Sequence, residues 1–228
     1  MKKAIIAFIS LIIFCIEPLM ASAEFSFKKY QVENGLSHNT TWCAIQDSYG
    51  FLWIGTSNGL NCYYGSGNKI YRNVLNDKYS LGNNFVGSLM EEGEDLWIGT
   101  SSGLYIYDRS DDHFLYFDKT TKYGVFISCE VKKIVKTKNG LIWIATYDPV
   151  KDVLTQNSIR TFFAWDICQG TDSLVYVSSM QEGLLCFDEQ GTFLQSYPVS
   201  FELNIGNQRI NCLHSIDHEI WCGVGTNS

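Results

Sequence analysis

Five near-copies of one short segment predict that this chain of 228 residues has an all-β fold, a β-propeller. The first copy reads Leu-Trp-Ile-Gly-Thr-Ser-Asn-Gly-Leu at 52–60, and the second reads Leu-Trp-Ile-Gly-Thr-Ser-Ser-Gly-Leu at 96–104. The copies are 44, 46, 33 and 45 residues apart when aligned on their aromatic residues, Trp53, Trp97, Trp143, Tyr176 and Trp221. A period in the mid-forties, marked by Trp and Gly, is typical of a propeller with one four-stranded blade per repeat.

The composition agrees with a folded chain of many short strands. Aromatic residues make up 14% of the sequence and there are only three prolines. The formal net charge is −7 and no basic run occurs. This charge argues against nucleic acid as a partner and favours neutral or weakly charged ligands.

The N-terminus has the pattern of a signal peptide. Met-Lys-Lys is followed by an apolar run over residues 4–16 and then by Ala21-Ser22-Ala23. We expect cleavage after Ala23 and export to the periplasm, with residues 1–23 removed and the propeller occupying 24–228. The apolar run has 13 residues, fewer than the roughly 20 that a membrane-spanning helix needs.

The chain from residue 24 reads as a series of strands. Residues 24–34 alternate apolar and polar side chains, which predicts an outer strand ahead of the first repeat. The first unit spans residues 35–79, and turn-forming residues separate its four predicted strands, 42–46, 52–56, 60–64 and 69–74. The second unit, residues 80–124, repeats this order with strands at 86–90, 96–100, 104–107 and 114–117.

The inner strands can be aligned by their distance from the aromatic residue of each copy. Trp42 precedes Trp53 by 11 residues, and Val86 precedes Trp97 by the same number. The equal spacing predicts that Trp42 and Val86 occupy equivalent positions in their blades.

The third and fifth units depart from the pattern. After the predicted strand at 142–146, the third unit (125–158) lacks the Gly-Leu corner and the next strand, which indicates a deletion after Tyr147. The fourth unit spans 159–203, and the fifth (204–228) stops where a Gly-Leu corner is expected. We therefore expect a partial propeller of about four and a half four-stranded blades, the third with a deletion, as an N-terminal fragment of a longer protein.

Three segments resemble two-component regulator propeller repeats: Asn-Gly-Leu-Ser-His-Asn at 34–39, Asp-Ser-Tyr-Gly-Phe-Leu-Trp-Ile-Gly-Thr at 47–56 and Asn-Gly-Leu-Asn at 58–61. Such repeats form the periplasmic sensor region of hybrid two-component systems in gut Bacteroidetes. In that family an immunoglobulin-like domain, a membrane helix, a histidine kinase, a receiver and often a DNA-binding domain follow. The resemblance implies a sensor of glycan-derived oligosaccharides, with the rest of the propeller and the kinase as partners and a homodimer in the full-length protein.

Ligand-binding residues are expected where the copies differ. A residue present in every copy serves the blade itself, so we predict that the repeated tryptophans pack in the core. His38 stands in the entry loop where the second unit has Gly82, Tyr147 lies beside the deletion, and Arg209 precedes the inner strand of the fifth unit. Aromatic and polar groups near one mouth of a propeller suit an oligosaccharide, and we predict these three residues as ligand contacts.

The seven cysteines that remain after cleavage are expected to be free thiols. Cys62 and Cys186 take the place of Ile106, and Cys222 takes a place that other copies fill with Ile or Val. An alternative reading joins Cys212, His214, His218 and Cys222 as a zinc site. Repeat variation explains these four residues better, and we expect neither a metal nor a cofactor.

No catalytic motif occurs in the sequence, so we expect no enzyme activity. There is no Gly-x-Ser-x-Gly and no phosphate-binding loop. Two alternatives from other classes stay open: a secreted propeller enzyme of the lyase or quinoprotein type, and a stand-alone carbohydrate-binding propeller.

Overall fold

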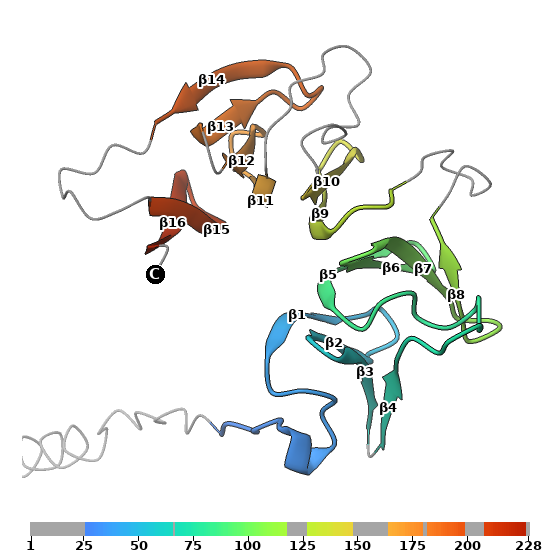
Figure 1. The fold of residues 1–228 in the computed structure, drawn as a ribbon. Coiled ribbons are helices and arrows are strands. Elements are labelled where there is room, and N and C mark those ends of the chain that lie inside the picture. Colours follow the sequence, from blue (N-terminus) through green and yellow to red (C-terminus); the bar gives the residue numbers. More distant parts are fainter. Residues whose placement is uncertain are drawn as a thin grey trace, which may run out of the picture. The chain divides into compact units, whose positions relative to one another are not determined.

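The computed structural model describes residues 26–65, 67–117, 127–147, 164–179, 182–198 and 208–226, and places the chain up to Tyr30 and the chain from Gln31 in separate compact units. Five antiparallel sheets follow one another along the described chain (Figure 1). The predicted signal peptide lies outside the described residues. Within them, no helix is long and apolar enough to cross a membrane.

The first two sheets each have four strands, joined in chain order from the innermost to the outermost. The first sheet consists of β1 (Thr41–Gln46), β2 (Leu52–Thr56), β3 (Gly59–Tyr64) and β4 (Gly67–Tyr71). The second consists of β5 (Val86–Glu92), β6 (Asp95–Thr100), β7 (Gly103–Asp108) and β8 (His113–Tyr116). The eight strands predicted for these two units are all present, with small shifts at their ends.

The later sheets are described less completely. The third has β9 (Val131–Lys136) and β10 (Ile142–Thr146), and the fifth has β15 (Gln208–Ile216) and β16 (Glu219–Thr226). The fourth has four strands: β11 (Ala164–Gln169), β12 (Val175–Ser179), β13 (Gly183–Phe187) and β14 (Phe193–Tyr197). The deletion predicted after Tyr147 falls at residues 148–163, which lie outside the described chain.

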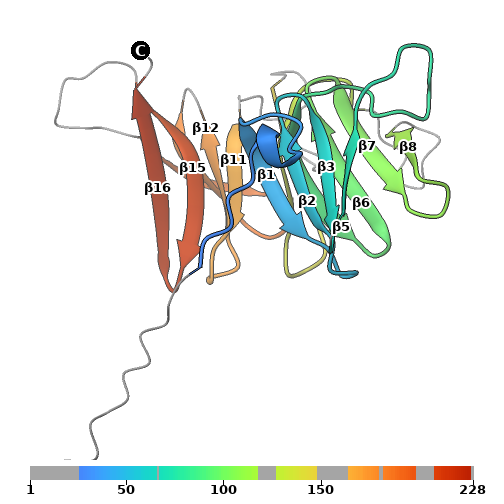
Figure 2. The same ribbon diagram turned by 90° about the horizontal axis from the view of Figure 1, so that it is seen from below.

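The sheets pack face to face in the manner of propeller blades. The first strands of successive sheets contact one another, β1 with β5, β5 with β9, β9 with β11 and β11 with β15. Figure 2 shows strands of the first and second sheets next to one another. An apolar cluster fills the space between each sheet and the next. The first cluster joins Trp53 and Leu60 of one sheet to Val86, Leu96 and Ile98 of the following sheet.

Polar links also join each inner strand to the next. The thiol of Cys43 points at the Val86 carbonyl oxygen, 3.8 Å away. At the same strand position one sheet later, the Ser88 hydroxyl oxygen accepts the Ile134 N–H at 3.0 Å. In each link a side chain of one blade forms a hydrogen bond with a backbone group of the next, so neighbouring blades supply hydrogen-bond partners for each other's backbone.

The repeated tryptophan packs in the core of the first three units, as predicted, and Tyr176 does so in the fourth. The exposed fraction is 1% for Trp53, and Trp97, Trp143 and Tyr176 are also buried. The prediction is wrong for Trp221, whose exposed fraction is 59%. No described sheet follows β16 to cover that side chain.

Each inner strand carries a β-bulge near its start, after the first residue in β1, β5, β9 and β11 and after the third residue in β15. The register shifts between Thr41 and Cys43 in β1, and the same break occurs in the other four inner strands. The extra residues of the five strands are Trp42, Gly87, Lys132, Trp165 and Asn211. Bulged residues stand outside the regular pairing of the ladder.

The bulges correct one alignment made from the sequence. Trp42 is equivalent to Gly87 in the structure and not to Val86. In the first sheet Trp53 pairs with Ile45, which lies eight residues before it in the sequence. In the second sheet Trp97 pairs with Met90, which lies only seven residues before it. The first turn of the second sheet is therefore one residue shorter, and a fixed spacing of 11 misplaces the inner strand by one.

The strand predicted at 24–34 is also wrong. Its described part has no strand, and Val32–Asn34 forms a 3₁₀ turn, η1. Phe27, which the prediction placed on a buried face, has an exposed fraction of 93%. A strand needs a partner to satisfy its backbone groups, and no described strand pairs with this segment.

Close packing between the second and third sheets depends on Gly99. A Cβ atom added there would lie 2.7 Å from Cγ1 of Val131, a fully buried side chain. We expect Gly99→Ala to lower the free energy of unfolding by about 1–3 kcal/mol, measured by urea denaturation. Ala145 holds the equivalent position of the third sheet, so Ala145→Gly serves as the comparison and removes only one methyl group. An unchanged midpoint for Gly99→Ala would contradict this account.

Candidate functional site

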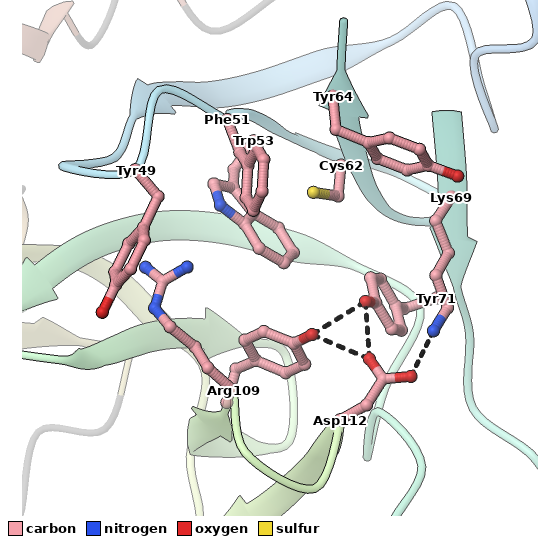
Figure 3. Close-up of a pocket in the computed structure, with 10 residues that line it drawn as sticks. Tyr49, Phe51, Trp53, Cys62, Tyr64, Lys69, Tyr71, Arg109 and Asp112 are labelled. Carbon is pink, nitrogen blue, oxygen red and sulfur yellow. Dashed lines mark hydrogen bonds and ion pairs between the residues drawn. The ribbon is translucent and has the colours of Figure 1, made fainter. Parts of the chain in front are cut away.

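A cleft opens between the first and second sheets of the propeller. Its volume is about 390 Å³, which is within the range of small-molecule sites. Strands β2, β3 and β4, the β1–β2 turn and the end of β7 with the turn that follows it supply its walls (Figure 3). The lining residues are Tyr49, Phe51, Trp53, Cys62, Tyr64, Lys69, Tyr71, Tyr107, Arg109 and Asp112.

Aromatic side chains dominate the cleft, and several of them are open to solvent. Tyr49 and Tyr64 have exposed fractions of 57% and 46%, while Trp53 is almost fully buried. The rings of Phe51 and Tyr64 meet edge to face with centroids 6.3 Å apart. An exposed aromatic wall beside buried aromatic residues is a favourable surface for stacking a flat apolar ligand face.

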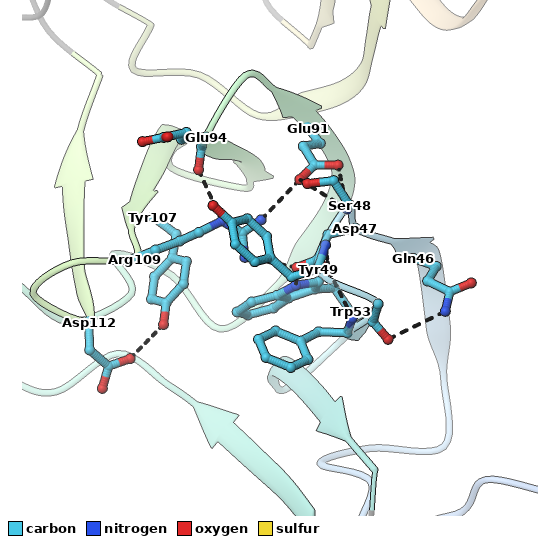
Figure 4. A network of polar contacts seen from close by, with 12 residues as sticks. Gln46, Asp47, Ser48, Tyr49, Trp53, Glu91, Glu94, Tyr107, Arg109 and Asp112 are labelled. Atoms are coloured by element: carbon cyan, nitrogen blue, oxygen red, sulfur yellow. Dashed lines mark hydrogen bonds and ion pairs between the residues drawn. The ribbon is translucent and has the colours of Figure 1, made fainter.

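One end of the cleft is fixed by a buried ion pair. Arg109 donates through Nη1 to Oδ2 of Asp47 at 2.8 Å and through Nη2 to Oε1 of Glu91 at 3.3 Å (Figure 4). Asp47 Oδ2 also accepts the indole N–H of Trp53 at 2.7 Å. The guanidinium carbon lies 4.7 Å from the centre of the Tyr49 ring, a cation–π contact. These contacts position Tyr49 at the cleft.

The environment of Asp47 lowers its pKa. Burial by itself would raise this pKa, but hydrogen bonds from Trp53, Arg109 and the Phe51 N–H outweigh it and favour the carboxylate. A lowered folded-state pKa stabilises the fold above the unfolded-state pKa of about 4, and this stability is lost as the pH falls through the folded-state value.

We therefore expect the free energy of unfolding of the wild-type protein to fall as the pH is lowered from about 5 to about 3, because the unfolded chain binds the proton more readily. Asp47→Asn should show a shallower decline over the same range. Denaturant titrations at several pH values measure the difference. Parallel pH curves for the two proteins would show that Asp47 is not a source of the acid sensitivity.

The other end of the cleft is a cluster of hydroxyl and charged groups. The hydroxyl groups of Tyr71 and Tyr107 each donate to Oδ1 of Asp112 at 2.7 Å, and Lys69 forms an ion pair with Asp112 Oδ2. Burial and the Asp112 contact raise the pKa of Tyr71, and burial raises that of Tyr107 to about 12. Burial would raise the pKa of Asp112, but the hydrogen bonds from Lys69 and the tyrosines lower it. Both tyrosines are therefore protonated at neutral pH and Asp112 is ionised.

The three residues predicted as ligand contacts lie outside this cleft. His38 accepts the Thr40 N–H through Nδ1 at 3.0 Å. Tyr147 follows β10, with its ring centre 6.2 Å from that of Trp165 and 5.3 Å from Lys132 Nζ. Arg209 lies in β15, and its side chain is outside the described part of the structure. No contact between His38 and Tyr147 occurs among the described interactions.

The alternative zinc site does not form. Cys222 pairs with Leu213 across β15 and β16, so its side chain faces the opposite side of the sheet from Cys212 and His214. His218 instead lies 3.2 Å from the Thr171 hydroxyl through Nδ1. Within the described residues there is no group of three His, Cys, Asp or Glu side chains that could hold a metal.

All seven described cysteines carry free thiols. Cys62 and Cys186 are buried, as their apolar positions predict, whereas Cys222 is exposed. Burial raises the pKa of the Cys62 thiol, which lines the cleft, to about 11. This thiol is protonated at neutral pH and is a weak nucleophile.

The cleft was missed from the sequence because its central residue belongs to the repeat. Trp53 was assigned to core packing, and it is both a core residue and part of the cleft wall. The usable signal lay in the turns. Asp47 stands where the third and fourth units have Thr137 and Gly170, so the Asp47–Arg109 pair is a departure from the repeat.

Comparison with known proteins supports the family assigned from the sequence. Residues 35–58 match the model of the two component regulator propeller family. A stretch of 60 residues is 40% identical to a protein named histidine kinase P4 from Formosa agariphila. That stretch is 26% of this chain and only 4% of the kinase, so the chain corresponds to a small part of that relative.

Solved structures show the same fold. The extracellular domain of a protein assigned to a hybrid two component system of B. thetaiotaomicron matches with a TM-score of 0.62 at 20% identity, over 82% of this chain and 27% of that chain. Virginiamycin B lyase from Staphylococcus aureus, a catalytically inactive form with quinupristin, matches with a TM-score of 0.59 at 13% identity, over 88% of this chain and 68% of that chain. At these identities the likeness establishes the propeller fold alone.

Proposed function

We propose that this chain, which carries a two component regulator propeller repeat at residues 35–58, is the ligand-sensing part of a hybrid two-component system and binds an oligosaccharide in the cleft between its first two sheets. The observation that carries the proposal is the cleft itself. It combines exposed aromatic rings with hydroxyl and charged groups at one end. Sugars present apolar ring faces for stacking and hydroxyl groups for hydrogen bonding, which suits both parts.

The groups in the cleft favour binding over turnover. Tyr71 and Tyr107 are protonated at neutral pH, so neither is ready to act as a general base. The ten lining residues include no histidine, and the single thiol among them, that of Cys62, is protonated. These properties support a sensor over the alternative of a lyase, which needs a base and electrophilic partners at one site.

The resemblance to the regulator propeller family extends the proposal to the location and the partners of the protein. Export to the periplasm through residues 1–23, coupling to a histidine kinase and pairing of two full-length copies all belong to it. His38, Tyr147 and Arg209 are further candidate ligand contacts in the same proposal. The cleft is favoured because it encloses a volume of about 390 Å³ between fixed walls.

Calorimetric titration against neutral oligosaccharides, including cellobiose, maltose, mannobiose and xylobiose, tests the proposal. We expect at least one to bind the wild-type chain, and Tyr49→Ala or Tyr64→Ala to weaken that binding about tenfold or more because a stacking surface is lost. Tyr79→Ala is the matched control. Tyr79 is also an exposed tyrosine with a cation over its ring, Lys78 at 4.6 Å, but it lies outside the cleft.

Two results would contradict the proposal in different ways. If His38→Ala or Tyr147→Ala weakens binding while the cleft variants do not, the ligand binds at that residue and not in the cleft. If no oligosaccharide gives heat, and one of them is consumed, the chain is an enzyme and not a sensor.

A further inference from the structure

We infer that Asp112 determines the chemical class of the ligand, so that the cleft selects neutral, hydroxyl-rich sugars over sugars that carry carboxylate or sulfate groups. This inference rests on the proposed function and concerns the same cleft. Three separate features of Asp112 support it. They are the hydrogen bonds that it accepts from neighbouring hydroxyl groups, the ion pairs of the nearby cations, and the backbone conformation of Asp112 itself.

The first feature is the count of donors and acceptors. A tyrosine hydroxyl has one proton, and the hydroxyl groups of Tyr71 and Tyr107 contact Oδ1 of Asp112 at 2.7 Å and each other at 3.0 Å, so both protons are used within this group. Their oxygens are left as acceptors, as is the unused lone pair of Asp112 Oδ2, which contacts only Lys69 among these groups. This end of the cleft is therefore rich in acceptors and favours a ligand that donates protons, as sugar hydroxyls do.

The second feature is the pairing of the two cations that line the cleft. Lys69 is paired with Asp112, and Arg109 is paired with both Asp47 and Glu91. Three carboxylates thus face two cations, which leaves an excess of negative charge. A ligand carboxylate or sulfate, which has acceptors only, would meet like charge here and could not replace the existing pairs without leaving one of them broken.

The third feature is the conformation that presents the side chain. Asp112 has a φ of 57°, in the left-handed region. The corresponding turns of the first and fourth sheets use glycines in this region, Gly65 at 61° and Gly191 at 86°. Only in the second sheet does the described turn place a carboxylate at this point, next to Tyr71 of the neighbouring sheet. Asn is also tolerated at such φ values, so Asp112→Asn changes the charge and keeps the turn.

The test compares matched ligands on matched proteins. Wild-type chain, Asp112→Asn and Asp111→Asn are each titrated with the neutral disaccharide that binds best and with digalacturonate. Asp111→Asn removes the same formal charge one residue away, at an exposed position that does not line the cleft. For the wild type we expect the neutral sugar to bind at least about tenfold more tightly than digalacturonate.

In Asp112→Asn, Lys69 loses its carboxylate partner and becomes available to the ligand. We expect the affinity for digalacturonate to rise about tenfold relative to the wild type, and the affinity for the neutral sugar to fall, whereas Asp111→Asn leaves both affinities unchanged. Equal binding of the two sugars by the wild type, or equal effects of the two variants, would overturn the role of Asp112 while leaving sugar binding intact. Absence of binding by every sugar would overturn the proposed function and this inference together.

Discussion

Asp47→Asn lowers the free energy of unfolding by about 3 kcal/mol in our expectation, as measured by urea denaturation at neutral pH. The side chain of Asp47 is fully buried and accepts hydrogen bonds from Arg109 and Trp53. Asparagine keeps the shape but removes the charge. Arg109, with a side-chain exposed fraction of 17%, would lose the nearer of its two carboxylate partners and retain Glu91 at 3.3 Å, together with the Glu94 carbonyl oxygen that its Nε contacts at 3.0 Å. A buried cation without its partner is the main source of the loss.

Asp188 provides a matched control for this substitution. Its carboxylate accepts the N–H groups of Gln190 and Thr192, two and four residues ahead, as Asp47 accepts those of Tyr49 and Phe51. The two turns thus have the same hydrogen bonds, but no described ion pair includes Asp188. We expect Asp188→Asn to cost about 1 kcal/mol, which is the value of the turn contacts alone. Equal losses for the two variants would show that the ion pair adds nothing to stability.

Trp53→Ala is expected to lower the free energy of unfolding by about 4 kcal/mol. The indole packs against the rings of Tyr71 and Tyr107, with centroids 5.9 Å and 5.1 Å away, and joins the cluster between the first two sheets. Alanine would leave a large cavity and would also remove a hydrogen bond to the buried Asp47.

Trp42→Ala is the control for Trp53→Ala, because it removes the same type of side chain from an exposed position of the same sheet. Trp42 lies in the same sheet, but it is the bulged residue of β1 and has an exposed fraction of 54%. Its indole N–H donates to the Ser57 hydroxyl at 2.8 Å, an exposed contact. We expect a loss of about 1 kcal/mol, checked by the same denaturation experiment. A comparable loss for both tryptophans would mean that the cluster between the sheets is not the dominant contribution at Trp53.

The propeller fold could be predicted from the sequence because the same pattern of strand and turn residues recurs in five copies. Strands are recognised from a local alternation of residues, and the recurrence of Trp, Gly and turn residues places them in blades. The prediction failed where a position depends on a partner. Trp221 has the residue type of the core but no described sheet over it, and residues 24–34 have the alternation of a strand but form no strand in their described part.

The cleft could not be found in the same way. It is made by side chains of two blades, and residues such as Asp47 and Arg109, or Lys69 and Asp112, meet across about 40 to 60 positions of sequence. Nothing local to one residue indicates the other. Spacing within a repeat also cannot reveal a turn that is one residue shorter, and this is why Trp42 was aligned with Val86 and not with Gly87.

The bulge in every inner strand has a consequence for how such a protein changes over time. The extra residue of each bulge takes no part in the register, so its side chain can be replaced without disturbing the ladder. The bulges of the five described inner strands hold an indole at Trp42 and Trp165, a hydrogen at Gly87, an ammonium group at Lys132 and an amide at Asn211. Each described sheet thus has one inner-strand position at which a single substitution can supply a new ligand contact without changing the strand register.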